Sequence, residues 1–362
     1  MIFKAVLSNK EHPEYGVVAL PFPISGNDYD YTLKLLERLG IGSPIAQDCR
    51  VEKLDSPYPI LNRLVTQGVN LDELDYLAKR LRSFCTDEGV QFQAAASMLC
   101  LSDIKDFINL TFCCQQATVI TDFFDLEGAG KAHSLIANGG SMPMDEFEKV
   151  DGLATALDLI QSGAGVVTPY GVVYDNGMKL EQIYAGSSFP QYQYEESLLT
   201  LRVPIQPETD RPAKTAWLYL PAPEQQIART LCRVGIINPD AAYLIEDDTL
   251  PPKIFEILEH SNDAISELNR LCQAIRGLDD AGLKKLEAVV LMAQPKEAGE
   301  IRQLAENLNQ FAFIPGVELS ENCQVNELGY VAYHGSLTLE ELMMDDPAEQ
   351  YQREQEMGGM MQ

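Results

Sequence analysis

One internal repeat constrains the fold of this chain more than any other feature. Residues 69–110 have the pattern of successive helices, and a diverged copy returns at 264–304 with a constant shift of 194 residues. Within it, Glu73–Leu81 aligns with Glu267–Ile275, and the apolar positions of the two stretches coincide. Apolar residues at i, i+3, i+4 and i+7 are typical of an amphipathic helix packed on a core. The alignment needs no gap.

The similarity continues on both sides of these helices, although chance similarity between two amphipathic segments is the competing interpretation. The flanking matches are Leu20-Pro21-Phe22-Pro23 with Leu220-Pro221-Ala222-Pro223 at a shift of 200, Gly40-Ile41 with Gly235-Ile236 at 195, and Gly165–Gly171 with Gly329–Gly335 at 164. The fall from 194 to 164 predicts that the second copy lacks about 30 residues of the stretch between Thr111 and Ile160. Two copies are too few for a solenoid. The pattern therefore predicts a tandem duplication of one domain.

The predicted fold is an elongated α+β tandem, in which each unit has a small β-sheet with a helix, then a helical layer, then a closing β-hairpin. The predicted parts are a first unit at 1–185 (a ββαβ part at 1–55, helices at 69–110 and a closing α/β part at 111–185), a linker at 186–196, a shortened second unit at 197–342, and a Met, Gln and Glu rich tail at 343–362 that we expect to be disordered.

Local patterns predict the elements of the first unit. We expect strands at 1–8, 15–20 and 46–54, helices at 28–39, 71–83, 87–99, 102–110 and 145–161, and strands at 165–174 and 178–184 joined by the turn Asp175-Asn176-Gly177. Asn70 is the expected N-cap of the second of these helices. The stretch 111–122 is β-branched and fits no single element.

The charge of the chain restricts its partners. There are 54 Asp and Glu against 27 Lys and Arg, a formal net charge of -27, in a chain that is 46% hydrophobic and so able to form real cores. Self-repulsion of this size opposes compaction. Direct binding to nucleic acid is excluded, because a duplex is itself a dense line of phosphates. The predicted partners are basic surfaces.

The acids are spread over both units, and pairs at i and i+3 of a helix share one face. The predicted acidic surface consists of Asp72, Glu73, Asp75, Asp103, Asp106, Asp122, Asp125, Glu127, Asp145, Glu146, Glu148, Glu246, Asp247, Asp248, Asp279, Asp280, Glu297 and Glu300. At one charge per ~1.7 Å of duplex, a net charge of -27 matches roughly 46 Å of DNA. The competing interpretation is a solvated surface that serves solubility alone.

Residues that resemble catalytic or cofactor motifs do not complete one. Gly128-Ala129-Gly130-Lys131 and Ser162–Gly165 fail the phosphate-loop pattern, which needs GxxxxGK[ST] between a strand and a helix. The histidines His12, His133, His260 and His334 lack metal-ligand spacing. We expect no catalytic residue, cofactor or metal. A thiol enzyme using Cys113 or Cys114 with His133 as base is the minor alternative.

Segments that would direct the chain to a membrane or out of the cell are not expected. The N-terminus lacks the pattern of a signal peptide, and no apolar run approaches the length of a membrane span. The eight cysteines form no CxxC pair and are expected to be reduced and mostly buried. The sequence therefore predicts a cytoplasmic protein.

The order of these features resembles that of ArdA-type antirestriction proteins. The resemblance rests on a strand pair ending in Leu20-Pro21-Phe22-Pro23, a short helix before Gly40-Ile41, a strand, the helices that begin with Glu73–Leu81, then Asp151–Leu159 and the closing strand Gly165–Tyr174. The first unit resembles a whole single-unit member of the family, as carried on conjugative elements of Firmicutes, and the second resembles a shortened one.

The resemblance implies a dimeric, non-enzymatic mimic of bent B-form DNA. Such a protein occupies the DNA-binding groove of type I restriction-modification enzymes and protects incoming mobile DNA. The duplication departs from the single-unit form, so the second unit could replace a dimer partner, extend the mimic or act elsewhere. The alternative function is an acidic interaction module that binds another basic DNA-processing or regulatory protein of the same element.

Overall fold

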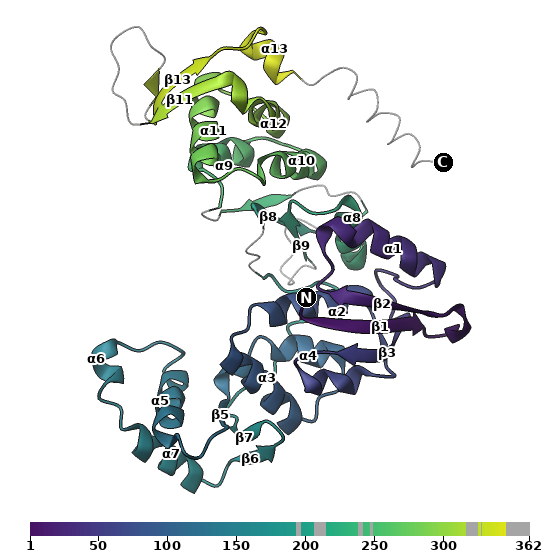
Figure 1. The fold of residues 1–362 in the computed structure, drawn as a ribbon, viewed down its shortest axis with the longest axis vertical. Coiled ribbons are helices and arrows are strands. Elements are labelled where there is room, and N and C mark those ends of the chain that lie inside the picture. Colours follow the sequence, from purple (N-terminus) through teal and green to yellow (C-terminus); the bar gives the residue numbers. More distant parts are fainter. Residues whose placement is uncertain are drawn as a thin grey trace. The chain divides into compact units, whose positions relative to one another are not determined.

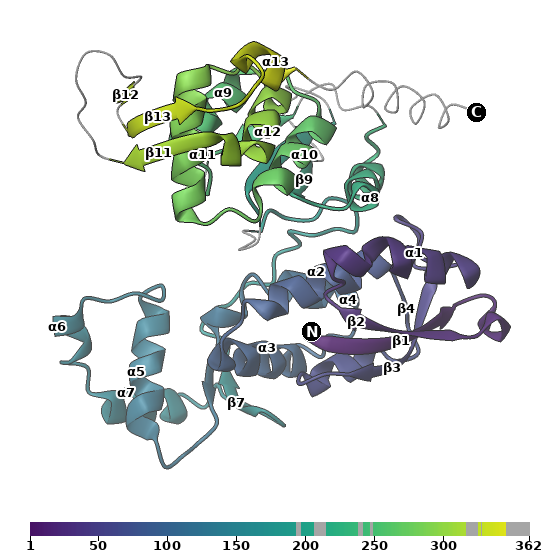
Figure 2. The same cartoon turned by 45° about the horizontal axis from the view of Figure 1, so that its top comes forward.

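The computed structural model describes residues 1–192, 197–205, 215–237, 242–246, 249–315, 325–326 and 328–344. The chain divides into two compact units, Met1–Tyr192 and Gln193–Gln362, and each contains its own hydrophobic core. Both units combine helices with small antiparallel sheets, which confirms the α+β class (Figures 1 and 2). The division falls inside the predicted linker 186–196.

The first sheet of unit 1 has the strand order β2-β1-β3-β4. Its elements are β1 (Phe3–Asn9), η1 (Pro13–Tyr15), β2 (Val17–Phe22), η2 (Gly26–Asp28), α1 (Tyr29–Arg38), β3 (Cys49–Asp55), η3 (Pro59–Leu64) and β4 (Gly68–Val69). The predicted ββαβ order is confirmed. Gly40 follows α1 with a φ of +64°, a backbone conformation that favours glycine and ends the helix.

The helical layer of unit 1 also matches the prediction. It consists of α2 (Leu71–Arg82), α3 (Thr86–Met98) and α4 (Ile104–Leu110). Asn70 caps α2 because its Oδ1 accepts hydrogen bonds from the backbone N–H of Asp72 and Glu73. Its Nδ2 donates to the carbonyl oxygens of Ser43 and Ala46 at 2.9 and 2.8 Å. One side chain therefore starts the helix and fixes the loop before β3.

The closing part of unit 1 is a second sheet with the order β5-β7-β6. Its elements are η4 (Cys114–Gln116), β5 (Thr118–Ile120), α5 (Leu126–Ala137), α6 (Met144–Phe147), α7 (Gly152–Gln161), β6 (Val166–Thr168) and β7 (Gly171–Tyr174). We call residues 121–165, which lie between β5 and β6, the α5–α7 excursion. Helices α5 and α7 cross where Gly130 and Gly152 lie, because a Cβ atom at either glycine would overlap the backbone of the other helix.

Three predictions for this part were wrong. The helix expected at 145–161 is two helices, because Asp151 has a non-helical backbone and its Oδ1 caps α7 by accepting from Ala154 N. The helix α5 was missed, since its glycines lower helix propensity, although one of them serves the crossing with α7. The hairpin is β6-β7 alone, and no strand occurs between 178 and 184. Asn176 instead donates to Gln116 O and Thr118 Oγ1.

The first part of the predicted linker packs against unit 1. The ring of Phe189 stacks on Tyr76 at 4.4 Å and on Tyr184 at 5.0 Å, and the Tyr76 hydroxyl donates to Pro190 O at 2.9 Å. The Arg80 guanidinium lies 4.7 Å from the ring centroid of Tyr192. Residues 186–192 are thus anchored by aromatic side chains, and 193–196 lie outside the described residues.

Unit 2 has two three-stranded sheets, with the orders β10-β8-β9 and β11-β13-β12. Its elements are β8 (Leu199–Pro204), β9 (Thr215–Leu220), α8 (Glu224–Val234), β10 (Tyr243–Ile245), α9 (Pro252–His260), α10 (Ile265–Ile275), α11 (Asp280–Ala293), α12 (Ala298–Glu306), η5 (Leu308–Gln310), β11 (Phe311–Pro315), β12 (Val325–Asn326), β13 (Gly329–Tyr333) and α13 (Leu339–Met343). Of the predicted tail, the part from 345 onward lies outside the described residues.

The same buried contact recurs between strand and helix in the two units. Ile24 N, just after β2, donates to Asp75 Oδ1 of α2 at 2.7 Å, and Ala222 N, just after β9, donates to Asn269 Oδ1 of α10 at 2.9 Å. Asp75 and Asn269 correspond at the predicted shift of 194. Ile24 and Ala222 correspond at a shift of 198, which corrects the predicted value of 200 for this strand end.

The closing sheets also correspond at a shift other than the predicted one. Gly171 begins β7 opposite Thr168, and Gly329 begins β13 opposite Asn326. Both glycines have positive φ. Gly329 therefore occupies the position of Gly171, at a shift of 158, and not that of Gly165 at 164. The correction follows from strand pairing, which the sequence alignment alone does not contain.

The Asn269 contact predicts a local stability effect. In Asn269→Ala, Ala222 loses the partner of its N–H and also the side-chain donor that binds its carbonyl oxygen at 2.9 Å. We expect a loss of about 1–3 kcal/mol in the free energy of unfolding. Trp217 in β9 is the single tryptophan, so its fluorescence during urea unfolding reports on unit 2. The exposed control Asn262→Ala should stay within about 0.5 kcal/mol of wild type. Equal midpoints for both variants would contradict the assigned role.

Candidate acidic interaction surface

Folding leaves the acidic excess of the chain at its surface. Among the described residues, the charged side chains that are buried are Glu73, Asp75, Arg233 and Arg302. Burial thus removes two negative and two positive charges, which cancel. Carboxylates at the surface stay ionised at neutral pH unless their surroundings raise their pKa. The described part of the protein therefore presents an acidic surface to solvent.

The α5–α7 excursion is a strongly acidic part of unit 1. Its residues include eight acids and two lysines, a formal net charge of -6. In both views its helices project away from the first sheet of unit 1 (Figures 1 and 2). The predicted surface acids of this region are all exposed, namely Asp122, Asp125, Glu127, Asp145, Glu146 and Glu148.

Three of these acids also hold the local backbone. Asp122 Oδ1 accepts from Phe124 N at 2.7 Å, and Asp125 Oδ1 caps α5 by accepting from Gly128 N at 2.9 Å. Glu127 binds Lys131 Nζ at 2.8 Å and accepts from Leu153 N, and these hydrogen bonds, that to Lys131 first, lower the pKa of Glu127. Such contacts favour the ionised carboxylate. The acids therefore combine a structural task with a permanent negative charge.

The acids of α6 have little local work. Asp145 lies 3.7 Å from Lys149 Nζ in an ion pair whose two side chains are each 76% exposed. Ion pairs this exposed contribute little to stability. The side chains of Glu146 and Glu148 form no hydrogen bond or ion pair with any residue that the structure describes. These three charges are available to a partner.

Two of the predicted surface acids are buried and cannot contact a partner. Glu73 is 2% exposed, and its Oε1 accepts from the Tyr184 hydroxyl at 2.8 Å. Asp75 is 7% exposed, accepts from Ile24 N and pairs with Lys79 Nζ at 2.6 Å. Acids in amphipathic helices are exposed by default, and only distant partners such as Tyr184 make burial possible. Their neighbour Asp72 is half-buried.

The acid pair at α4 shows real repulsion. Asp103 is exposed and caps the helix by accepting from Lys105 N at 2.8 Å. Asp106, three residues later, is half-buried. Burial raises the pKa of Asp106, and the negative charge of Asp103 raises it further. The i and i+3 spacing therefore brings the two carboxylates close enough to interact, as expected for one helix face.

The acids of unit 2 lie at several separate places. Glu246, Asp279, Asp280 and Glu297 are exposed, and Glu300 is half-buried. Asp279 Oδ1 caps α11 by accepting from Gly282 N at 2.8 Å, and Glu300 Oε2 accepts from Lys296 N at 2.6 Å. The predicted surface residues Asp247 and Asp248 lie outside the described residues.

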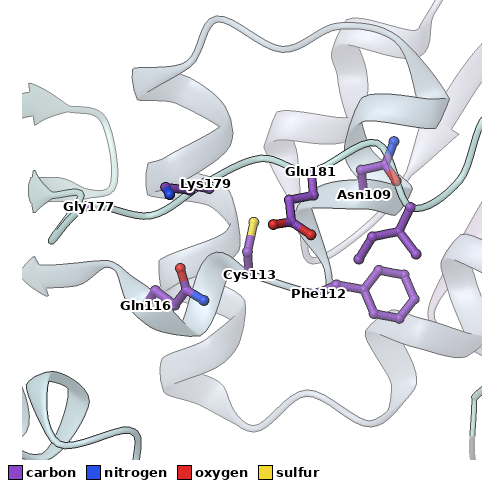
Figure 3. A pocket seen from close by; sticks show the side chains of 8 residues that line it. Asn109, Phe112, Cys113, Gln116, Gly177, Lys179 and Glu181 are labelled. Atoms are coloured by element: carbon purple, nitrogen blue, oxygen red, sulfur yellow. The ribbon is translucent and has the colours of Figure 1, made fainter.

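A small pocket in unit 1 contains one of the candidate nucleophiles. It has a volume of about 230 Å³ and is lined by Asn109, Phe112, Cys113, Gln116, Gly177, Lys179, Glu181 and Ile183 (Figure 3). Ligand pockets are commonly larger, roughly 300–1,000 Å³, and mostly apolar. Burial raises the pKa of the Cys113 thiol, and the charge of Glu181 raises it further. A thiol in these surroundings stays protonated and is a poor nucleophile.

The other residues of the thiol-enzyme alternative do not form a catalytic pair. Burial raises the pKa of Cys114 well above its usual range. His133 Nδ1 lies 2.9 Å from Thr118 Oγ1, and burial lowers the pKa of this imidazole. Within the described residues, no hydrogen bond joins His133 to Cys113 or Cys114. The arrangement offers no base for either thiol.

The glycine-rich stretches have structural positions. Gly128 and Gly130 lie inside α5, and Ser162–Gly165 follows α7 instead of preceding a helix. Backbone N–H groups in these positions cannot form the strand-to-helix phosphate loop. In the part of the chain that the structure describes, no three His, Cys, Asp or Glu side chains are grouped to hold a metal ion, and no helix has the length and apolarity needed to cross a membrane.

No protein-family model, curated protein or solved structure matches this chain. Its function is therefore inferred from the chemistry of its own surface.

Thiol accessibility tests the interpretation of the cysteines. Cys85, Cys100 and Cys232 are exposed, whereas Cys49, Cys113, Cys114 and Cys272 are buried, and burial raises the pKa of Cys272 to about 12. At about pH 8 the buried thiols stay protonated, so only the three exposed ones should react rapidly with a thiol reagent, as read by peptide mass spectrometry. Labelling in urea is the control. Rapid labelling of Cys113 or Cys114 in the native protein would revive the thiol-enzyme alternative.

The Asp103 and Asp106 pair predicts a measurable shift. Asn is as good an N-cap as Asp, so Asp103→Asn removes the charge and keeps the cap. The pKa of Asp106, read by NMR titration of its carboxyl carbon, should fall toward its ordinary value and remain above it because of burial. Since the folded-state pKa is raised, Asp106 stabilises the fold at low pH, and this contribution disappears as rising pH ionises it. The remote variant Asp145→Asn should leave the pKa of Asp106 unchanged, and an unchanged value in Asp103→Asn would refute the repulsion.

Proposed function

We propose that this protein is an antirestriction protein that imitates B-form DNA. It occupies the DNA-binding groove of a type I restriction-modification enzyme and so protects incoming mobile DNA. The observation that carries the proposal is that folding buries equal numbers of acids and cations and leaves the excess of acids outside. A groove built for a duplex attracts such a surface, because it is lined by cations that neutralise phosphates. The resemblance of the first unit to ArdA-type proteins points the same way.

The amount of charge is adequate for this role. A net charge of -27 equals the charge of roughly 46 Å of duplex at one charge per ~1.7 Å. Two of the proposed contact residues, Glu73 and Asp75, are withdrawn because they are buried. The exposed acids of the α5–α7 excursion take the leading place among the remaining ones.

The two units are proposed to descend from one duplicated domain. Support comes from the recurring element order, from the strand order β2-β1-β3 beside β9-β8-β10, and from the matching contacts of Asp75 and Asn269. The second unit has nine residues, 316–324, where the first has the 45 residues of the α5–α7 excursion. In this proposal unit 1 is the main mimic, and unit 2 either replaces the second subunit of a dimer or extends the surface.

A second candidate is an acidic module that binds another basic protein of the same mobile element, such as a DNA-processing or regulatory protein. The capping contacts favour it. Asp103, Asp125 and Asp279 each satisfy a helix N-terminus, which explains these acids without any likeness to DNA. Both candidates have a basic protein as partner, and neither involves catalysis, a cofactor or direct binding to nucleic acid.

Competition with DNA distinguishes the two. The full chain is titrated into a complex of labelled duplex and purified type I methyltransferase at about 50 mM and about 200 mM salt. We expect displacement that weakens steeply with salt, because binding releases counterions from both partners. Absence of displacement at the lower salt concentration would contradict mimicry and favour the second candidate.

A charge variant of α6 makes the test specific. Asp145→Asn, Glu146→Gln and Glu148→Gln together remove three exposed charges and should weaken displacement by about tenfold, at roughly 0.5 kcal/mol per charge. The charge-preserving control exchanges Asp145→Glu, Glu146→Asp and Glu148→Asp and should compete like wild type. Equal competition by both variants would exclude α6 from the contact surface.

A further inference from the structure

The turn before α5 presents two adjacent phenylalanines to solvent. Phe123 is 52% exposed and Phe124 is fully exposed. Neither ring belongs to the core of unit 1. Turns are usually made of Gly, Pro, Asn, Asp or Ser, because these residues suit the backbone or the solvent. Neighbouring apolar side chains held in water mark a site of interaction.

The turn is held rigidly by the acids on either side of it. Asp122 Oδ1 accepts from Phe124 N at 2.7 Å, which closes the turn from the N-terminal side. Asp125 Oδ1 accepts from Gly128 N at 2.9 Å and caps α5 on the other side. The backbone of both rings is thus fixed before any partner arrives. A preorganised aromatic pair loses little conformational entropy on binding, which is typical of interface hot spots.

The turn belongs to a segment that unit 2 does not have room for. It is part of the 45-residue α5–α7 excursion, and the matching connection in unit 2 has nine residues. Helices α5 and α7 pack together at Gly130 and Gly152, so the excursion is held without the two rings. Connection of β5 to β6 therefore does not explain Phe123 and Phe124.

We propose that Phe123 and Phe124 form an aromatic anchor that inserts into an apolar pocket bordered by Arg or Lys side chains on a partner protein. Charge complementarity identifies the partner, because Asp122, Asp125 and Glu127 surround the turn with carboxylates. A second copy of this chain would oppose these carboxylates with its own. The rings add nothing to an imitation of phosphates, so they provide recognition that DNA does not.

This inference rests on the proposed function and makes its partner more specific. The DNA-binding groove, or its edge, must contain an apolar pocket beside the cations that hold phosphates. Contacts of the acids weaken with salt, whereas burial of two rings does not. The two contributions can therefore be separated by the salt dependence of binding.

The test measures the affinity of the full chain for a purified type I methyltransferase at two salt concentrations. Phe123→Ser with Phe124→Ser should weaken binding by about tenfold or more at both concentrations. The dependence of affinity on salt should stay that of wild type. Val17→Ser with Tyr31→Ser is the matched control, because both side chains are exposed and lie elsewhere in unit 1. Unchanged circular dichroism of each variant verifies folding, since no buried contact is removed.

The outcomes separate this inference from the proposed function. If the wild-type chain does not bind the methyltransferase, the proposed function fails and the anchor loses its partner with it. If wild type and the phenylalanine variant bind equally, the anchor alone is refuted. Sedimentation provides the remaining arm: if the phenylalanine variant is monomeric where wild type self-associates, the rings contact a second copy and the basic partner is refuted.

Discussion

In each unit, one buried polar side chain ties the helical layer to the end of a strand. Ile24 and Ala222 follow the strands β2 and β9, so their N–H groups have no further ladder partner. A buried donor without a partner is costly, and Asp75 and Asn269 supply the acceptor. The packing of helices on the sheet depends on this contact, because it fixes where the chain turns away from the strand. An acid in one unit and an amide in the other do the same work.

The same economy explains how a chain with a net charge of -27 remains folded. Asp103, Asp125 and Asp279 stand at helix N-termini, where unpaired N–H groups and the helix dipole favour a negative charge. Each carboxylate stabilises its own helix and still contributes to the acidic surface. Helix capping and electrostatic display are therefore compatible uses of one residue, and the repulsion between Asp103 and Asp106 is what remains uncompensated.

Local patterns in the sequence predicted the parts of the fold that local forces determine. The bounds of α2, α3 and α4 and the cap at Asn70 follow from apolar periodicity and from hydrogen bonds to the next turn. Features that depend on distant residues were missed or wrong. Burial of Glu73 requires Tyr184, more than a hundred positions away, and the glycines of α5 are explained only by its crossing with α7. Within the predicted surface, exposure was right for the α6 acids, which have no distant partners.

Charge alone gives a mimic reach without discrimination. Electrostatic attraction is non-directional, and salt screens it over about 10 Å, so an acidic protein is attracted to every basic surface in a cell. Discrimination requires a short-range contact whose shape only the correct partner completes. In the proposed mechanism the acids of α6 supply the attraction, and the rigid turn at Phe123 and Phe124 supplies the contact. Because both occur within one excursion that unit 2 lacks, selection of the partner falls to unit 1, and unit 2 is free to diverge.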